Sequence, residues 1–515
     1  MSTLRRLVAS LRERLLPGES VGERAANGAV WAMLTNGLGR GLQLGKLLVL
    51  ANLLSQAAFG IVGLALLLLV ALRRFSNLGI DEALVQHPDG DVDAYLDTAF
   101  AVRVVRGVLL AGLLYAVAPL LAGVFAAPDQ RSLVTAVVRA VGLVPLLRGL
   151  QNPGVVYLRK ELAFHREFGY RVGTAVVDVT VAVAAAFTLG TVWALVYGTV
   201  AGAATRLVLS FVVHDYRPGL GFDTGRAREM VGFGKWITGS GIASFLTTEG
   251  DDAFVGWFLG LGALGLYQTA YRFSNAPATE ITHVVSSVVF PAYSKLQDDT
   301  AALETAYFRT VTVTTFLAFP AAVGIAVVAP TFVEAFVRNE QGWDLPLLAT
   351  TMQVLAAWGL LRAIGATTGP LFRAVGRPDY ETKIQAGKLV LVATAIYPLT
   401  AAYGVLGTGA AIVGASLLGA EPVATYLAVR TVDGSYRRFL RLLAYPAAGS
   451  AAMGLAVLAV ETTVTFPSAL VEFVALVGVG VGTYLAAVPV LRLLGYDIGH
   501  VLREAGVAAF APAAN

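Results

Sequence analysis

Positively charged side chains lie inside segments of the sequence that are otherwise apolar. Arginine and lysine are donors suited to phosphate and pyrophosphate oxygens. A charge near the centre of a bilayer costs roughly 2.5 to 3.5 kcal/mol on insertion scales, so several such residues require a wet cavity, partners or both. We interpret them as a cationic cavity for a phosphate-bearing headgroup, with structural pairing between helices as the alternative. The candidates are Arg272, Lys46, Arg40, Arg103, Arg106, Arg148, Arg206 and Arg362.

Two of these candidates are predicted to lie near the middle of the membrane. A turn centred near Gly262 puts Asp252 and Arg272 at equal distances from it, about 15 Å along a helix. The internal repeat of the chain gives Lys46 a similar depth on the first span. Pairing of Asp252 with Arg272 is the structural alternative to headgroup binding.

Carboxylates in the same apolar segments permit ion coupling. The candidates are Glu249, Asp251, Asp252 and Asp178, each of which could bind H⁺ or Na⁺ if it is buried. The alternative is a salt bridge with no role in transport.

The surrounding chain has the composition of an integral membrane protein. Of its 515 residues, 56% are hydrophobic and only 14% charged, compared with about 25% charged in soluble domains. Apolar segments of 18 or more residues recur from about residue 25 to 494, and each is long enough to cross the hydrocarbon core as a helix. We expect an all-α, polytopic fold of about fourteen transmembrane helices.

Basic residues predict the orientation of these spans. Arginine and lysine in short loops mark the cytoplasmic side. They precede the first span and follow the fourth, sixth, tenth and twelfth spans, whereas the opposite loops offer little beyond Arg131 and Arg338. We therefore expect a multi-pass protein of the cell membrane with both termini in the cytoplasm, and segment 1–24 as an interfacial amphipathic helix.

An internal repeat divides the chain. The sequence LLSQAAFGIVGLA (53–65) matches FLGLGALGLYQTA (258–270), and LDTAF (96–100) matches LETAY (303–307). Each copy contains six predicted spans. Because this number is even, the two copies have the same orientation in the membrane, with a central cavity between the lobes. We therefore predict an N-lobe at 25–215, a linker at 216–229, a C-lobe at 230–431, two further helices at 432–493 and a tail at 494–515.

Several apparent motifs fail for lack of context. Gly260, Gly262 and Gly265 have the spacing G-x-G-x-x-G, but no strand precedes them, so we expect a tight turn and close helix packing rather than a nucleotide site. The acidic loop 88–97 lacks the glycine and glutamate of a calcium loop. With no P-loop, no cysteine and scattered histidines, we expect no ATP, metal or cofactor chemistry.

The chain resembles oligosaccharide flippases of the polysaccharide-biosynthesis type, within the multidrug/oligosaccharidyl-lipid/polysaccharide exporter superfamily. The resemblance covers most of the chain and rests on the order and spacing of its motifs. Besides the repeat segments, these are NLGIDEALVQ, YLRKELAFHREF, GTVWALVYGTVAG, MVGFGKW, DDAFVGWFLGLGALGLYQTAYRFSNAPA, VVFPAYSKLQDD and RAVGRPD. Two departures are Asn52 and Gln56-Ala57-Ala58 at an outer corner that is commonly charged, and Lys160 where arginine is usual.

The resemblance implies alternating access that moves a lipid-linked oligosaccharide, on a polyprenyl or dolichyl phosphate or pyrophosphate, from the cytoplasmic to the outer leaflet. It implies no enzymatic activity and no nucleic-acid partner. Membrane lipids, H⁺ or Na⁺ and glycan-assembly enzymes are the other expected partners. Tyr267 and Tyr271 are candidates for stacking on sugars, with packing as the alternative. The rival functions are a cation-coupled drug exporter, a membrane polymerase or ligase, and a non-transporting component of a glycan-assembly complex.

Overall fold

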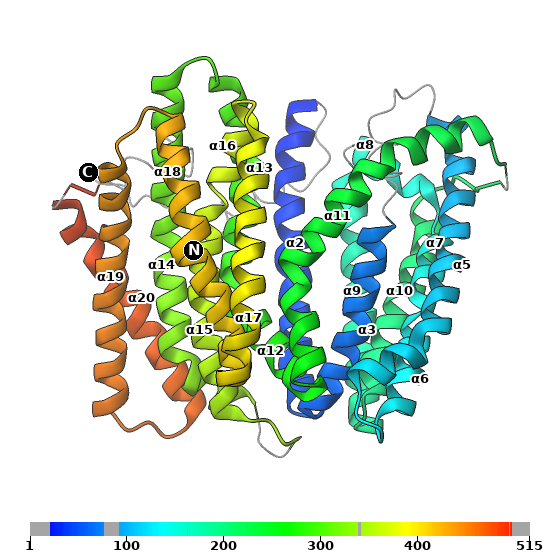
Figure 1. Cartoon of the computed structure of the whole chain (residues 1–515), viewed down its shortest axis with the longest axis horizontal. Coiled ribbons are helices and arrows are strands. Elements are labelled where there is room, and N and C mark those ends of the chain that lie inside the picture. The colour runs from blue at the N-terminus through cyan, green and yellow to red at the C-terminus, as the bar shows by residue number, and fades with distance from the viewer. Residues whose placement is uncertain are drawn as a thin grey trace, which may run out of the picture. The chain divides into compact units, whose positions relative to one another are not determined.

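Helices make up the regular structure of the described part of the chain, which is a computed structural model (Figure 1). The structure describes residues 21–76, 92–161, 163–219, 221–337, 341–493 and 495–496. Most of the predicted amphipathic segment 1–24, nearly all of the tail 494–515 and the start of the acidic loop 88–97 lie outside the described residues.

Ten of the described helical segments are long and apolar enough to cross a membrane, so the chain is a multi-pass membrane protein. One of them, residues 378–431, has 54 residues and would extend about 80 Å if straight, far beyond one bilayer. Its helix α17 (Pro378–Ala415) is broken at Gly404, where φ is 58°. The hydroxyls of Thr400 and Thr408 lie 2.8 Å apart across this break, so the chain reverses there. The predicted count of fourteen spans stays a prediction.

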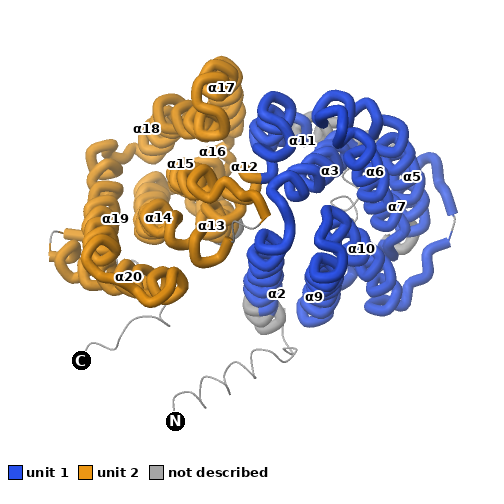
Figure 2. The backbone as a smooth tube through the Cα atoms, turned by 90° about the horizontal axis from the view of Figure 1, so that it is seen from below, with its two compact units in different colours: residues 1–265 blue, residues 266–515 orange. Residues whose placement is uncertain are grey.

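The chain packs as two compact units, Met1–Gly265 and Leu266–Asn515 (Figure 2). This division comes one helix later than the predicted linker 216–229, because α11 (Thr224–Phe258) packs against α3 (Gln56–Phe75) of the first unit. The predicted lobes are defined by the internal repeat, whereas the two units are defined by packing. The predicted lobe boundaries therefore stay a prediction.

The first unit is a bundle of long helices. Besides α3 and α11, it contains α2 (Val21–Ala51), α5 (Val92–Phe125), α6 (Arg131–Val141), α7 (Leu143–Gly149), the 3₁₀ turn η1 (Pro153–Val156), α8 (Tyr157–Lys160), α9 (Phe164–Leu189) and α10 (Trp193–Val213). α9 packs between α2 and α10, and α5 packs on α6 and α7. Leu109 and Leu120 on α5 are 65% and 67% exposed, as expected for an outer surface that meets lipid.

The second unit has its own core. After α12 (Leu261–Ser274), which begins in the first unit, it contains α13 (Ala276–Leu296), α14 (Thr300–Phe336), α15 (Leu345–Gly365), α16 (Thr368–Ala374), α17, the π-helical turn η3 (Ser416–Ala420), α18 (Glu421–Thr431), α19 (Tyr436–Thr463) and α20 (Ala469–Leu493). Tyr293, Tyr307, Phe308, Phe372 and Phe439 are fully buried together and hold α13, α14, α16 and α19 around one another.

The glycines of the G-x-G-x-x-G stretch serve a tight turn and close packing, as predicted. Gly260, between α11 and α12, has a φ of +87°, which favours glycine. Gly265 lies against Gly60 of α3, its partner in the internal repeat, and a Cβ on Gly265 would lie 2.7 Å from the Gly60 nitrogen. α3 begins at Gln56 and α12 at Leu261, which are also partners at the same offset.

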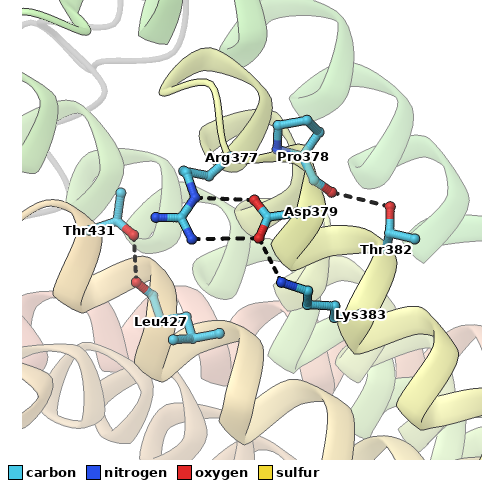
Figure 3. Close-up of polar contacts among 7 residues, drawn as sticks. All are labelled: Arg377, Pro378, Asp379, Thr382, Lys383, Leu427 and Thr431. Atoms are coloured by element: carbon cyan, nitrogen blue, oxygen red, sulfur yellow. Dashed lines mark hydrogen bonds and ion pairs between the residues drawn. The ribbon is translucent and has the colours of Figure 1, made fainter.

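Basic residues of the predicted cytoplasmic loop after α16 are paired with acids (Figure 3). Arg377 Nε lies 3.1 Å from Asp379 Oδ1, and Lys383 Nζ lies 2.9 Å from Asp379 Oδ2. The hydrogen bond to Asp379 raises the pKa of Arg377. These side chains are exposed, so their pairs add little stability.

Candidate functional site

An arginine-lined cavity of about 1030 Å³ lies within the first unit. Residues from α2, α3, α5, α7, α9, α10 and η1 line it, and a cavity of this size accepts a headgroup with attached sugars. Glu167 is the one acidic residue in the described lining. The arginines of the lining are Arg40, Arg73, Arg103, Arg106, Arg148, Arg171 and Arg206. Five of these seven are candidates from the sequence, and the structure brings those five together.

Two glycines let α5 and α7 approach closely enough to gather the arginines they carry. A Cβ on Gly107 would lie 2.7 Å from the Pro145 carbonyl oxygen, and a Cβ on Gly149 would lie 2.5 Å from that of Arg103. Because these neighbours are backbone atoms, no side-chain rotation would relieve the contact. Arg103 on α5 and Arg148 on α7 therefore line one cavity.

The guanidinium groups of Arg148 and Arg206 are available to a ligand. Neither makes a hydrogen bond or ion pair with another side chain or carbonyl among the described residues. They are close enough to interact electrostatically with each other and with Tyr170, which is buried at 9% exposure in the cavity wall. Clustered like charges of this kind favour binding of an anion, which relieves their repulsion.

Arg106 has a different arrangement because it is tied to the end of α3. Its Nε donates to Ser76 Oγ at 3.0 Å, and its Nη2 donates to the Arg73 carbonyl oxygen at 3.0 Å. We infer that Arg106 positions the end of α3 as well as contributing charge to the cavity.

A buried asparagine fixes the loop that follows Arg148. Asn152 is 1% exposed, its Oδ1 accepts from Gly154 N at 2.9 Å, and its Nδ2 donates to the Tyr216 carbonyl oxygen at 2.6 Å. Its own backbone nitrogen donates to Ser210 Oγ at 2.9 Å. These bonds hold η1 against the end of α10 and so position the part of the cavity wall that follows Arg148.

Sequence reasoning missed three members of this site. Arg73 lies at the end of an apolar helix, where arginine is usually taken for an interfacial residue. Arg171 follows the fourth predicted span, where basic residues predict only the cytoplasmic side; it is paired at 2.9 Å with Glu167 on the same helix. Tyr170 carries no charge signal. The helical spacing of Glu167, Tyr170 and Arg171 is the pattern that places them on neighbouring faces of α9.

Lys46 lies outside the described cavity lining and forms an ion pair. Its Nζ lies 2.7 Å from Asp178 Oδ1, and the two side chains are 11% and 15% exposed. Gln43, which does line the cavity, donates from Nε2 to Asp178 Oδ2 at 2.9 Å. Asp178 also lies against Gly198 and Gly202 of α10. The structure thus shows Lys46 and Asp178 in the structural salt bridge that was the alternative to a role in transport. Headgroup binding by Lys46 and ion coupling by Asp178 stay predictions.

Removal of one partner from this pair is expected to destabilise the first unit. Asp178→Asn leaves the Lys46 ammonium in a poorly hydrated site, at a cost of about 3 to 5 kcal/mol. The thermal unfolding temperature in detergent is expected to fall for Asp178→Asn and for Lys46→Met, and to recover in the double variant. If the double variant is as unstable as the sum of the single variants, the pair is not the reason for their burial. Transport by a stable double variant tests whether Lys46 also binds the headgroup.

The remaining cationic candidates lie in the second unit. Arg362 on α15 donates to Tyr271 Oη at 2.7 Å and to the Asn275 carbonyl oxygen at 3.4 Å, so it braces α15 against α12 and the start of α13. Arg272 is exposed on α12. Tyr267 is fully buried, which gives it the packing role rather than sugar stacking. Headgroup binding by Arg272 and its pairing with Asp252 stay predictions.

The other acidic candidates lie on α11. Glu249, Asp251 and Asp252 are partly buried there. In the described ranges, no three histidine, cysteine, aspartate or glutamate side chains cluster in a way that could hold a metal ion.

Comparison with known sequences shows what the chain is similar to. The family model described as "Polysaccharide biosynthesis protein" matches residues 49–341. Lipopolysaccharide biosynthesis protein WzxC of Escherichia coli (strain K12) is 27% identical over 379 residues, which cover 73% of this chain and 75% of WzxC. Teichuronic acid biosynthesis protein TuaB of Bacillus subtilis (strain 168) is 24% identical over 380 residues, which cover 73% of this chain and 77% of TuaB. These matches confirm the resemblance predicted from the sequence.

Comparison with solved structures confirms the predicted fold class. The lipid II flippase MurJ, in an inward closed conformation, matches with a TM-score of 0.71 over 90% of this chain and 100% of MurJ, at 15% identity. An inward-facing multidrug resistance MATE family transporter of the MOP superfamily matches with a TM-score of 0.61 over 78% of this chain and 94% of that chain, at 16% identity.

Proposed function

Because the chain belongs to the polysaccharide biosynthesis protein family, we propose that it is a flippase for a lipid-linked oligosaccharide. The cargo is an oligosaccharide on a polyprenyl or dolichyl phosphate or pyrophosphate. The protein moves it from the cytoplasmic to the outer leaflet of the cell membrane by alternating access. It makes and breaks no covalent bond, and glycan-assembly enzymes supply and use the cargo.

The observation that carries this proposal is the cavity with seven arginines and one carboxylate inside a membrane-embedded unit. Burying so much positive charge is costly unless an anion compensates it. Phosphate and pyrophosphate oxygens are suitable acceptors for arginine, and the cavity has room for sugars next to them. The lipid chain would stay in the bilayer while the polar part crosses.

The orientation of the cavity fits the same direction of transport. Arg148 on α7 and Arg171 on α9 lie towards the helix ends that adjoin the basic segment 157–166. Basic loops are cytoplasmic under the positive-inside rule, as are both termini in this proposal. The headgroup therefore enters from the leaflet in which lipid-linked sugars are made.

The test uses purified protein in liposomes with a fluorescent polyprenyl pyrophosphate oligosaccharide in both leaflets. A membrane-impermeant quencher reports how much label is exposed outside. We expect full quenching with the protein and about half in protein-free liposomes, since labels in the inner leaflet are then trapped. If labelled lipid does not move and an organic cation is extruded against an imposed ion gradient, the drug-exporter alternative replaces this proposal.

A further inference from the structure

A buried carboxylate in the second unit lies outside the site described above. Glu421 is the first residue of α18 and directly follows the π-helical turn η3. π-helical turns interrupt regular helices and frequently occur at functional sites. The side chain as a whole is partly buried, but its Oε2 atom is inaccessible and has no hydrogen-bond partner among the described residues.

The backbone of α15 leaves space for this carboxylate. A Cβ on Gly365 would lie 2.7 Å from Glu421 Oε2 and 2.8 Å from Oε1. Any side chain at position 365 would therefore displace the carboxylate. The carboxyl group lies against Gly365, the last residue of α15. An ionised carboxylate loses its hydration there, and this costs free energy unless hydrogen bonds or opposite charges replace the water.

Among the described residues, Lys388 on α17 is the charged group that interacts electrostatically with Glu421. The Lys388 ammonium also lies 3.8 Å from the centre of the Trp358 ring, over its face. Tyr307 on α14 also lies close enough to interact with Glu421 electrostatically. A neutral carboxylic acid loses less hydration on burial than a carboxylate does, which suits the buried Oε2 atom that receives no hydrogen bond from the described residues.

Two other charged groups on the surrounding helices, Arg362 and Arg373, have partners elsewhere. Arg362 on α15 bonds to Tyr271, and Arg373 on α16 pairs with Glu381 at 2.9 Å. η3 has the sequence SLLGA and contains no titratable side chain. Burial and the positive charge of Lys388 are therefore what act on the charge state of Glu421.

We propose that Glu421 is a proton-binding site that takes up a proton in one conformation of the transport cycle and releases it in another. This inference rests on the proposed flippase function and adds a proton as the coupled ion. The carboxylate accepts one proton and becomes a neutral carboxylic acid, and no other bond changes. The regular helix is interrupted at Gly404 and at the turn η3, and these interruptions are the points at which the segment before Glu421 could bend.

The experiment compares the wild type with Glu421→Gln, which keeps the shape of a protonated carboxyl group. A difference of one pH unit across the liposome membrane is expected to shift the distribution of fluorescent cargo between leaflets by up to about tenfold, the equivalent of moving one proton. Glu421→Gln is expected to lose this shift while exchange at equal pH continues. Glu381→Gln, a partly exposed carboxylate of the same unit, is the matched control and should keep the shift.

A second measurement needs no cargo. Infrared difference spectra of the purified protein between acidic and alkaline pH should contain a protonated carboxyl band that is missing in Glu421→Gln and present in Glu381→Gln. In Lys388→Gln the band should persist to a more alkaline pH, because the compensating positive charge is gone. If cargo moves but Glu421→Gln responds to the pH difference like the wild type, the proton site is wrong and the flippase function stands. If the band behaves as expected but no cargo moves, the flippase function fails and the proton site stands.

Discussion

Arg148→Gln combined with Arg206→Gln is expected to reduce flipping of a pyrophosphate-linked oligosaccharide by about 100-fold or more. Hydrogen bonds to charged groups contribute about 1.5 to 3 kcal/mol each, and both guanidinium groups are available to the cargo. Each single variant is expected to lose about tenfold or more for the same reason. The rate of quencher-accessible exchange in liposomes measures the loss directly.

Arg139→Gln is the matched control. Arg139 belongs to α6 of the same unit, lies over the ring of Tyr115 and donates to the Tyr115 carbonyl oxygen, outside the cavity lining. Its replacement should leave exchange unchanged. Wild-type rates for the double cavity variant would show that the arginines do not bind the cargo. Equal losses in the control would point to a general effect of charge on the folded unit.

Gly265→Val is expected to prevent the first unit from folding correctly. A Cβ at this position would lie 2.1 Å from the Gln56 carbonyl oxygen, and a Cβ on Gly60 would lie 1.6 Å from that of Leu261. Backbone atoms cannot rotate away, so α3 and α12 would have to separate, at a cost above about 3 kcal/mol. The Gln56 side chain, which donates to the Gly262 carbonyl oxygen at 2.9 Å, would lose its bond in the same movement.

The measurement is the yield of monodisperse protein in detergent together with its unfolding temperature. Gly112→Val on α5 is the control, because nothing lies within 4 Å of a Cβ there. It should give normal yield. A normally folded Gly265→Val protein would mean that α3 and α12 do not touch as closely as the structure shows.

The sequence predicted features that follow from composition and spacing. Apolar length predicted membrane helices because hydrocarbon thickness fixes how many residues a span needs. The repeat predicted that Gly60 and Gly265 are equivalent, and the G-x-G-x-x-G stretch predicted close packing there, but not that these two glycines contact each other. That contact depends on how helices distant in sequence come together.

The site was predicted in part for a similar reason. Arg103, Arg106 and Arg148 stand out because an arginine in an apolar segment needs a physical explanation. Which arginines share one cavity depends on the approach of α5 and α7 through Gly107 and Gly149, and no local pattern encodes that approach. Glu421 was not a candidate from the sequence, because a single carboxylate beside a proline at the start of a helix carries no signal of a special site.

The charge of the arginine cavity also acts on the protein when no cargo is bound. An excess of guanidinium groups over the single carboxylate Glu167 means that the empty cavity carries several positive charges. Moving one charge through a membrane potential of 100 mV changes the free energy by about 2.3 kcal/mol. Under the proposed function, we therefore expect a negative cell interior to hold the unloaded cavity towards the cytoplasm. A bound pyrophosphate would cancel part of that charge, so we expect loading to weaken the effect of the voltage and to permit the outward step.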